Sequence, residues 1–376
     1  MSLSVLHICS DFAKQRIYSE MVRQMAQDGV AQKVYVPVRS DKELEFFKSA
    51  NIAGVDFQYA KILRPAHRIL FRRKIRMVTK DLLSRVDPRN VTNVHAHFLY
   101  SDGGVARVLH KTYGLPYVVS VRNTDVNLFM KLRPDLRWLA QDILERARRV
   151  VFITPSYRDL VSEWLPARRR GAFNAKARII PNGLPQYWLA NTYHGERHGD
   201  ALKILYVGDF SRNKNIPRSI AAVSRLNASR PVTLTLVGGG GDGEDEVKSL
   251  LASSPCVSWR GRVDKPEELS NIYRQHDIFL MPSLKETFGV VYLEAMSQGL
   301  PVIFSRGQGI DGYFEPGGVA EAVNPLDSDS IATAILALAQ RLDRVREQCV
   351  ASAEAFNWPR VARLYVDSYK DSLGNG

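Results

Sequence analysis

Two glutamates eight positions apart, Glu286 and Glu294, are the residues whose type and spacing first suggest chemistry. Glu286 follows the strand-like run HDIFLMPS, whereas Glu294 stands in the mostly apolar stretch VVYLEAMS. An unpaired charge in an apolar helix carries a large desolvation cost, so a glutamate there needs a partner. Because a carboxylate can accept hydrogen bonds from two hydroxyl groups, both residues are predicted to bind a hydroxyl-rich ligand. The alternatives are an exposed loop acid at Glu286 and a solvent-facing helical position for Glu294.

The segment between the two glutamates is predicted to bind an anion. A helix is expected to begin near Phe288 and to end at Gly299, which leaves free backbone amides at its N-terminus. These amides and the helix dipole attract negative charge, and a glycine lets a ligand approach the backbone. A sugar at Glu286, a diphosphate at the amides and a ribose diol at Glu294 would fit a nucleoside diphosphate sugar. The donor-binding residues of this segment are Thr287, Phe288, Gly289 and Val290.

A loop with two basic residues is predicted to neutralise the diphosphate. It follows the strand-like run LKILYVG, which ends at Gly208, and it holds Arg212 and Lys214 before a predicted helix start at Ile216. Such loops lie at the C-terminal edge of a parallel sheet, where ligands bind in doubly wound folds. The alternative for both side chains is a solvated loop position.

These motifs occur in an order that resembles a known family. The segment MPSLKETFGVVYLEAMSQGLPVI is similar to the E-x7-E region of retaining GT-B glycosyltransferases, in particular glycosyltransferase family 4. ILYVGDFSRNKNI and LTLVGGGGDGE resemble the family's strand-plus-basic-loop element and its glycine turn. VSWRGRV resembles the segment beside the nucleobase, so the resemblance places Arg262 and Val263 there. The family often has an arginine directly after the glycine corresponding to Gly208; Asp209 stands here instead, and Arg212 is the suggested substitute.

The resemblance implies a retaining hexosyltransferase that works without a metal ion or another cofactor. A hexose or N-acetylhexosamine would leave a nucleoside diphosphate, for which UDP is common in the family, and join a glycan or lipid-linked saccharide. The departing phosphate would take the proton of the acceptor hydroxyl, while Lys214, Arg212 and the helix amides stabilise the developing charge. Glu286 would complete this catalytic group. Synthesis of a cell-surface polysaccharide or glycolipid is the expected setting.

The expected acceptor side departs from the family pattern. Many members carry a histidine after the strand that corresponds to PYVVSVR, where this chain has Arg122, and a Gly-Gly turn where it has SDFAKQRIY. Arg122 is predicted to act catalytically near the sugar–phosphate junction, and Asn123 and Asp125 to bind the acceptor. The alternative is a structural Arg–Asp pair at a turn. His97 is a further acceptor-binding candidate, although a buried core histidine is the alternative, and no metal site is expected because no third ligand stands nearby in sequence.

The elements that must position these residues are short apolar strands alternating with helices. Nearly continuous Val- and Ile-rich runs are typical of buried parallel strands. Two sets of such runs predict an α/β protein of GT-B architecture, with two Rossmann-like doubly wound domains facing a cleft. Residues 1–192 are expected to bind the acceptor and 193–357 the donor, with the polar stretch ANTYHGERHGDA as linker. The C-terminal helix, 358–376, is expected to cross back to the first domain.

Positive charge is concentrated in the first half of the chain. The net charge is +13, and residues 1–192 hold 32 Lys and Arg against 16 Asp and Glu. Residues 61–80 contain eight Lys and Arg and no acid. Such a basic amphipathic segment is typical of proteins that lie on anionic lipid headgroups, and a solvated helix face is the alternative. The apolar residues within it are Ile69, Leu70, Ile75 and Val78.

Two other functions remain open from composition and motifs. A nucleotide-sugar epimerase could share the fold. A nucleic-acid binder would suit the pI of about 9.6, but the second half is acidic and lacks interleaved stacking aromatics, so neither a nucleic acid nor a protein partner is expected. No apolar run of about 18 residues and no secretory signal is present, so a cytoplasmic enzyme at the cytoplasmic face of a membrane is expected. The three cysteines, Cys9, Cys256 and Cys349, are expected to be buried thiols.

Overall fold

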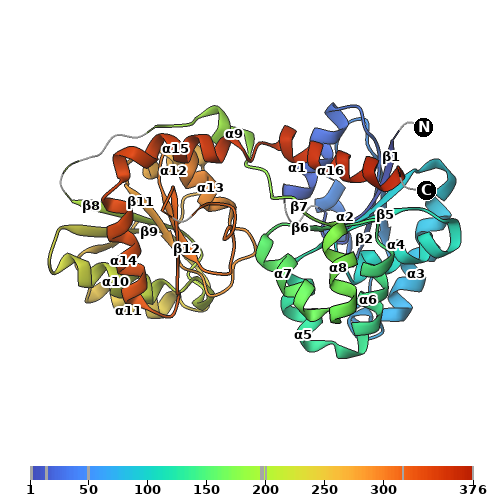
Figure 1. The fold of residues 1–376 in the computed structure, drawn as a ribbon, viewed down its shortest axis with the longest axis horizontal. Coiled ribbons are helices and arrows are strands. Elements are labelled where there is room, and N and C mark those ends of the chain that lie inside the picture. Colours follow the sequence, from blue (N-terminus) through green and yellow to red (C-terminus); the bar gives the residue numbers. More distant parts are fainter. Residues whose placement is uncertain are drawn as a thin grey trace. The chain divides into compact units, whose positions relative to one another are not determined.

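The computed structural model describes residues 3–12, 16–48, 51–194, 199, 201–315 and 317–374. The chain forms two compact units, of which the first comprises Met1–Asn182 with Trp358–Gly376 and the second Gly183–Asn357 (Figure 1). The unit boundary falls earlier than residue 192 because α9 (Gln186–Ala190) belongs to the second unit, where Trp188 meets Tyr273 edge to face. Within the expected linker, residues 195–198 and 200 lie outside the described residues.

The first unit is built on a seven-stranded parallel sheet in the order β3-β2-β1-β4-β5-β6-β7. Side chains of one strand alternate between its two faces, so Leu6 enters one core and Val5 the other. Burial on both faces explains the nearly continuous apolar runs. The strands are β1 (Ser4–Ile8), β2 (Ala31–Val38), β3 (Asp56–Lys61), β4 (Asn93–Ala96), β5 (Tyr117–Val121), β6 (Arg149–Phe152) and β7 (Ala177–Ile179).

Helices cover both faces of this sheet. Leu82 of α3, Leu109 of α4 and Ile143 of α6 belong to one core, whereas Met21 of α1 and Tyr365 of α16 belong to the other. The C-terminal helix α16 therefore returns to the first unit, as predicted, and it packs beside α1. The stretch KQRIYSEMVRQMAQDG, residues 14–29, is predicted from its apolar stripe to be a helix, and its first two residues, 14–15, lie outside the described residues. The helices are α1 (Arg16–Gln27), α2 (Asp41–Lys48), α3 (Phe71–Arg85), α4 (Ser101–Tyr113), α5 (Met130–Leu132), α6 (Arg137–Arg146), α7 (Pro155–Trp164), α8 (Ala167–Lys176) and α16 (Trp358–Leu373).

The second unit has a six-stranded parallel sheet in the order β10-β9-β8-β11-β12-β13. In both sheets the strand order reverses after the first strand of the unit, which makes each sheet doubly wound. The strands are β8 (Leu202–Gly208), β9 (Val232–Gly238), β10 (Val257–Trp259), β11 (Ile278–Met281), β12 (Val302–Ser305) and β13 (Ala320–Val323). The remaining helices are α10 (Ile216–Asn227), α11 (Glu244–Ala252), α12 (Pro266–Arg274), α13 (Val290–Ser297), α14 (Ser328–Ala339) and α15 (Leu342–Glu354).

Two strands were not predicted from the sequence, and both are edge strands. β3, with the sequence DFQYAK, and β13, with the sequence AEAV, have only one neighbour each. An edge strand is less buried, so it lacks the continuous apolar run on which the prediction rested. The three cysteines are buried free thiols, as predicted. Among the described residues, no helix is long and apolar enough to cross a membrane.

Candidate active site

The turn between β11 and α13 positions Glu286. Gly289 precedes the first residue of α13 and has a φ of 79°, a left-handed conformation that favours glycine. A Cβ atom on Gly289 would lie 2.4 Å from the ring of Tyr292, so a larger residue would displace that ring. The Tyr292 hydroxyl in turn donates a hydrogen bond of 2.6 Å to the carbonyl of Met281, the last residue of β11. The strand end and the helix start are thereby braced against each other.

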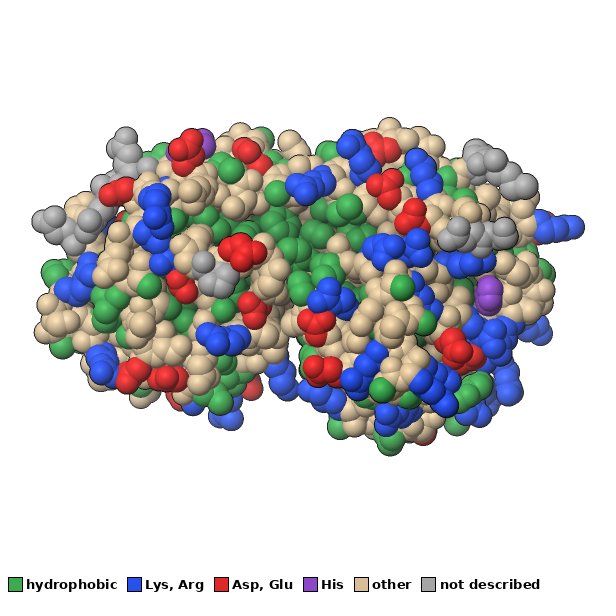
Figure 2. Space-filling view, in the orientation of Figure 1, with side chains coloured by type: hydrophobic (Ala, Val, Ile, Leu, Met, Phe, Trp, Pro, Cys, Tyr) green, Lys and Arg blue, Asp and Glu red, His purple; other side chains and the backbone are tan. Residues whose placement is uncertain are grey.

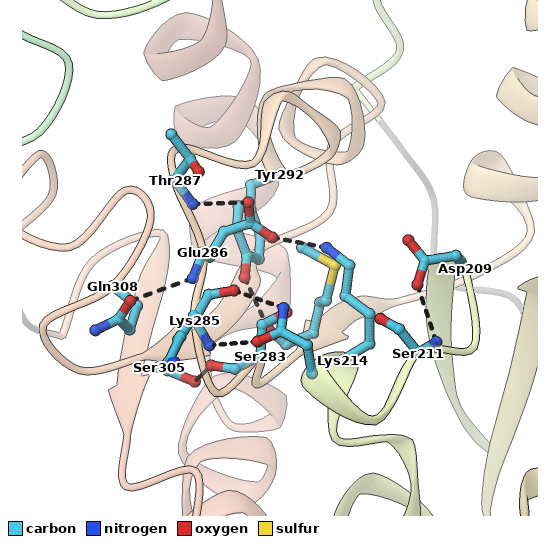
Figure 3. A network of polar contacts seen from close by, with 12 residues as sticks. Asp209, Ser211, Lys214, Ser283, Lys285, Glu286, Thr287, Tyr292, Ser305 and Gln308 are labelled. Carbon is cyan, nitrogen blue, oxygen red and sulfur yellow. Dashed lines mark hydrogen bonds and ion pairs between the residues drawn. The ribbon is translucent and has the colours of Figure 1, made fainter. Parts of the chain in front are cut away.

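Glu286 forms an ion pair with Lys214, as Figure 3 shows, with 2.8 Å between Nζ and Oε2. Their side chains are only 13% and 17% exposed. Lys214 ends a short 3-10 helix, Arg212–Lys214, that follows β8. Because β8 and β11 are the neighbours at which the strand order reverses, the pair stands where doubly wound sheets bind ligands. The other Glu286 oxygen accepts the Thr287 amide at 2.9 Å, and lone pairs remain for hydroxyl donors.

Two asparagines fasten the Lys214 loop to the Glu286 loop. The Asn213 side chain donates to the carbonyl of Lys285 at 2.8 Å and accepts its amide at 3.0 Å. Asn215 has a φ of 59°, which asparagine tolerates better than most residues, and its amide donates to the carbonyls of Pro282 and Pro325. Lys214 lies between these two anchors, so its position is set before any ligand arrives.

The start of α13 offers unoccupied hydrogen-bond donors. Within the described part of the chain, the backbone amides of Phe288, Gly289 and Val290 have no acceptor. Together with the positive end of the helix dipole they suit an anion. The Phe288 side chain is buried and meets Tyr313 edge to face, so only its backbone is available to a ligand. Thr287 is half-buried beside them.

Glu294 is half-buried in α13, and burial raises its pKa to about 7. The Tyr273 hydroxyl lies 3.5 Å from its Oε2 atom, a long hydrogen bond. No Lys, Arg or His pairs with this carboxylate among the residues the structure describes. A diol would supply the missing donors and would favour the ionised form. The role of Glu294 in binding ribose stays a prediction.

Gly208 lies where β8 and β9 come very close. A Cβ atom on Gly238 at the end of β9 would lie 1.8 Å from the Gly208 carbonyl oxygen. A Cβ atom on Gly208 itself would lie 2.8 Å from the Tyr206 hydroxyl. Glycines at both positions therefore keep the backbone open beside the loop that carries Lys214.

The other residues assigned to the donor are more exposed. Arg212 is exposed, and across the described ranges its guanidinium has no partner, whereas Lys214 contacts Glu286 directly. Arg262 is exposed and pairs with Asp264 at 2.7 Å, and Val263 is half-buried. Their proximity to a nucleobase stays a prediction.

Arg122 follows β5 and is buried, with only 6% of its surface exposed. Its guanidinium carbon lies 5.4 Å from the centre of the Tyr18 ring, and its Nε and Nη1 atoms lack hydrogen-bond partners among the described residues. Buried unpaired donors are rare in folded proteins, and they point to a ligand as the missing partner. The predicted catalytic role of Arg122 is compatible with this geometry.

Asp125 holds backbone segments together. Its buried carboxylate accepts the amides of Leu99 at 3.0 Å and of Arg122 at 2.9 Å, and burial raises its pKa to about 6. Asp125 therefore pairs with Arg122 at this turn through the backbone amide of Arg122. Asn123 is half-buried, and its side-chain oxygen accepts the Asn127 amide at 2.6 Å. Of the three site candidates after β5, Arg122 and Asp125 are buried and Asn123 has the most accessible side chain.

His97 belongs to a buried cluster with His7 and His95. His97 Nε2 lies 3.1 Å from His7 Nδ1, and His95 bonds Ser120 at 2.9 Å and Tyr369 at 2.7 Å. Burial lowers the pKa of His7 to about 4 and holds those of His95 and His97 well below the usual range. The buried-histidine alternative thus describes His97, since all three rings are fully buried.

The structure supplies the third histidine that the sequence spacing did not reveal. Ligand atoms of the three rings lie within 4.8 Å of one another, which would allow a metal ion. Both ring nitrogens of His7 and both of His95 already have hydrogen-bond partners, however. Of the six ring nitrogens in this cluster, only Nδ1 of His97 lacks a partner among the described residues. An ion would have to break these bonds, so the cluster fits a neutral hydrogen-bonded core better than a metal centre.

Asp102 was overlooked as a functional candidate. It lies in the first turn of α4, is 1% exposed, and accepts the Ser10 hydroxyl at 2.6 Å. Burial raises its pKa to about 7, and the charge of Lys74 opposes this rise. Ser10 follows β1 and Asp102 follows β4, so their bond spans the point where the first sheet reverses its strand order. The available signal in the sequence was an aspartate before two glycines, shortly after the strand-like run TNVHAHF.

The basic segment 61–80 does not form a free amphipathic helix. Ile75 and Val78 of α3 are buried in the core of the first unit, so the helix uses its apolar side internally. Of the four apolar residues named for this segment, only Ile69 and Leu70, in the turn before α3, are exposed, by 79% and 47%. On the face drawn in Figure 2, Lys and Arg side chains gather over the helices of the first unit. Any contact with lipid would therefore use this basic surface and the short turn.

Comparison with known proteins agrees with this arrangement. The family described as Glycosyltransferase Family 4 matches residues 15–185, and Glycosyl transferases group 1 matches residues 201–341. A D-inositol 3-phosphate glycosyltransferase of Corynebacterium kroppenstedtii is 30% identical over 190 residues, which is 47% of this chain and 42% of that protein. A protein of the same name from Paenarthrobacter aurescens is 26% identical over 305 residues, 74% of this chain and 72% of that one.

The fold has close counterparts among solved structures. Sucrose-phosphate synthase from Thermosynechococcus elongatus superposes with a TM-score of 0.74 at 19% identity, and each chain is covered completely. Two doubly wound units with polar groups at their switch points define the GT-B class of α/β protein. The chain belongs to the glycosyltransferases of family 4.

Proposed function

We propose that this protein is a retaining glycosyltransferase that uses a nucleoside diphosphate sugar as donor. A hexose or N-acetylhexosamine would be transferred to a glycan or a lipid-linked saccharide during synthesis of a surface polysaccharide or glycolipid. The observation that carries the proposal is the Lys214–Glu286 pair at the switch point, beside the unoccupied amides of Phe288, Gly289 and Val290. A cation and three amides suit a diphosphate, and the carboxylate suits sugar hydroxyls.

The reaction would proceed by attack on the face that the leaving group departs from. The bond between the anomeric carbon and the phosphate oxygen breaks, and the acceptor oxygen bonds to the same carbon. The acceptor proton passes to the departing phosphate. Lys214 and the α13 amides would stabilise the charge on that phosphate, a task for which no divalent metal is needed, and the exposed Arg212 would add to it.

The acceptor would bind to the first unit. Arg122 has unpaired buried nitrogens that could bind the acceptor, and Asn123 is accessible next to it. Asp125 and His97 are buried, so we assign them to positioning the surrounding loops. The basic surface of this unit would place the enzyme at the cytoplasmic face of an anionic membrane.

An epimerase of the same fold is the competing function. It would use the same donor site but would interconvert donors with no acceptor present. The net charge of +13 also suits a nucleic-acid-binding protein. Nanomolar binding of nucleic acid that weakens steeply with added salt would favour this function.

Calorimetric titration with UDP, GDP and ADP tests the donor site, with UDP expected to bind. Glu294→Ala should weaken the binding of the preferred nucleotide about tenfold or more, because two hydroxyl hydrogen bonds to a carboxylate are lost. Glu347→Ala is the matched control, since Glu347 is an exposed glutamate in the helix α15 of the same unit. EDTA should leave the binding unchanged.

The outcomes separate the alternatives. Binding of one nucleotide that depends on Glu294 but not on Glu347 supports the proposal and names the base. No binding of any nucleotide to the wild type contradicts it. Donor interconversion without an acceptor would replace the transferase with the epimerase.

A further inference from the structure

A basic cavity opens on the first unit between the β3–α3 connection and the turn after β5. Its volume is about 520 Å³. A second depression of about 570 Å³ adjoins it and shares part of its wall. Neither wall includes a carboxylate. The polar residues that line the first cavity are Arg39, Arg64, His67, Lys74, Thr124 and Arg133.

Some of the cationic side chains that line this cavity have carboxylate partners in ion pairs, and others do not. Arg133 pairs with Asp135 at 2.7 Å and Arg39 approaches Glu43 at 3.8 Å. Arg64 and Lys74 form no ion pair in the described ranges of the chain, although the carboxylates of Asp102 and Asp11 attract Lys74 from farther away. The two cations line the same cavity, and an anion bound between them would lower their mutual repulsion.

Lys74 is half-buried, and burial lowers the pKa of its ammonium group. An ammonium in such a place is stabilised by a bound anion. His67 is buried beside it, and its Nδ1 accepts the Arg64 amide at 3.0 Å. Its Nε2 therefore carries the proton of the neutral ring and can donate to an anion. Burial and then the charges of Lys74 and Arg64 lower the pKa of His67.

Apolar side chains surround the mouth of the cavity. Leu128 and Leu132 line it and are 46% and 66% exposed. Leu70 lines the adjoining depression, and the neighbouring Ile69 is also exposed. An anion attached to an apolar chain would match both parts of this surface.

We propose that this cavity binds a phosphate group carried by an acceptor with an apolar chain, at a site formed by Arg64, His67 and Lys74. The site adjoins the predicted acceptor residues, because Thr124 in its wall stands between Asn123 and Asp125. The inference rests on the proposed transferase function. It narrows the acceptor to a phosphate-linked lipid saccharide.

Titration with dodecyl phosphate below its micelle concentration, and separately with inorganic phosphate, tests the site. Lys74→Met and Arg64→Met should each weaken dodecyl phosphate binding roughly tenfold or more, as expected for one charge-assisted hydrogen bond. Lys80→Met is the matched control, since Lys80 lies on the same helix, is exposed and does not line the cavity. Dodecyl phosphate should bind at least about tenfold more tightly than inorganic phosphate because of the exposed leucines.

Vesicles of phosphatidylcholine with and without phosphatidylglycerol separate a specific site from a charged surface. Equal losses of dodecyl phosphate or vesicle binding in Lys74→Met and Lys80→Met would overturn the proposal in favour of a non-specific basic surface. Equal affinity for inorganic and dodecyl phosphate would overturn the lipid-linked acceptor. Nucleotide binding, measured on the same variants, should be unchanged. A lack of nucleotide binding in all proteins, the wild type included, would count against the donor site alone. Failure of the proposed donor site and failure of the phosphate site can therefore be told apart.

Discussion

Lys214 and Glu286 lie 2.8 Å apart although 72 positions separate them in sequence, and their loops follow β8 and β11, the two neighbouring strands at which the strand order reverses. The ion pair is mostly buried, and Asn213 ties the two loops together through Lys285. Lys214 and Glu286 therefore act as a coupled pair in the candidate site, and a ligand bound there would contact both side chains.

Removal of Lys214 should mainly weaken nucleotide binding, whereas removal of Glu286 should mainly slow the transfer reaction. Lys214→Met should weaken nucleoside diphosphate binding about tenfold or more, because the proposed donor site assigns this cation to the diphosphate. Glu286→Gln should leave nucleotide binding nearly unchanged and lower the transfer rate about 100-fold, because Glu286 is assigned to the sugar. Calorimetry and a transfer assay measure the two effects.

Lys285→Met provides the control for this pair. Lys285 is exposed next to Glu286, and its backbone rather than its side chain holds Asn213. The variant should keep both binding and transfer rate. If it lost as much nucleotide affinity as Lys214→Met, the general charge of the loop, rather than the position of Lys214, would be responsible.

Glu294→Gln should stabilise the second unit at high pH. Glu294 keeps its proton up to about pH 7 in the folded state, whereas the ordinary value is 4.5. Its stabilising contribution is therefore present at low pH and is lost as the pH rises through 7. The glutamine variant should gain about 2 kcal/mol in unfolding free energy relative to wild type between pH 5 and pH 8. Urea denaturation at both values measures this, and Glu347→Gln should show no such trend.

Gly289→Ala should damage the anion site through the backbone. The φ of 79° disfavours alanine, and its Cβ would press on the Tyr292 ring. We expect a loss of about 1–3 kcal/mol in stability and weaker nucleotide binding. Gly171→Ala is the control, because Gly171 lies in α8 with nothing within 4 Å of a new Cβ, and it should stabilise slightly. Equal melting temperatures for wild type and Gly289→Ala would contradict the proposed brace.

Asp125→Ala should destabilise the first unit by about 2–3 kcal/mol, because it leaves buried amides of Leu99 and Arg122 without an acceptor. Asp159→Ala removes an exposed partner of Arg158 and should change little. Thermal unfolding of both variants measures the difference. Similar small changes in the two would mean that Asp125 is not structural, and its predicted role in binding the acceptor would regain support.

The sequence by itself determined the α/β class, most strands and the two loops that the structure brings together around Lys214 and Glu286. Buried parallel strands need apolar residues on both faces, so each appears as a continuous run that can be read without a structure. The glycine and the glutamates near residue 290 are local in sequence, and their spacing follows from one turn and one helix. Edge strands such as β3 lack that signal and were missed.

Tertiary structure alone decided which distant residues meet. Parallel strands that are neighbours in the sheet can be far apart in the chain, so sequence spacing could not bring Lys214 to Glu286, Ser10 to Asp102 or His7 to His97. The tertiary structure also decided which side of each amphipathic helix is buried. The apolar side of α3 faces the unit's own core, because amphipathic spacing is the same whether the partner is a sheet or a lipid surface.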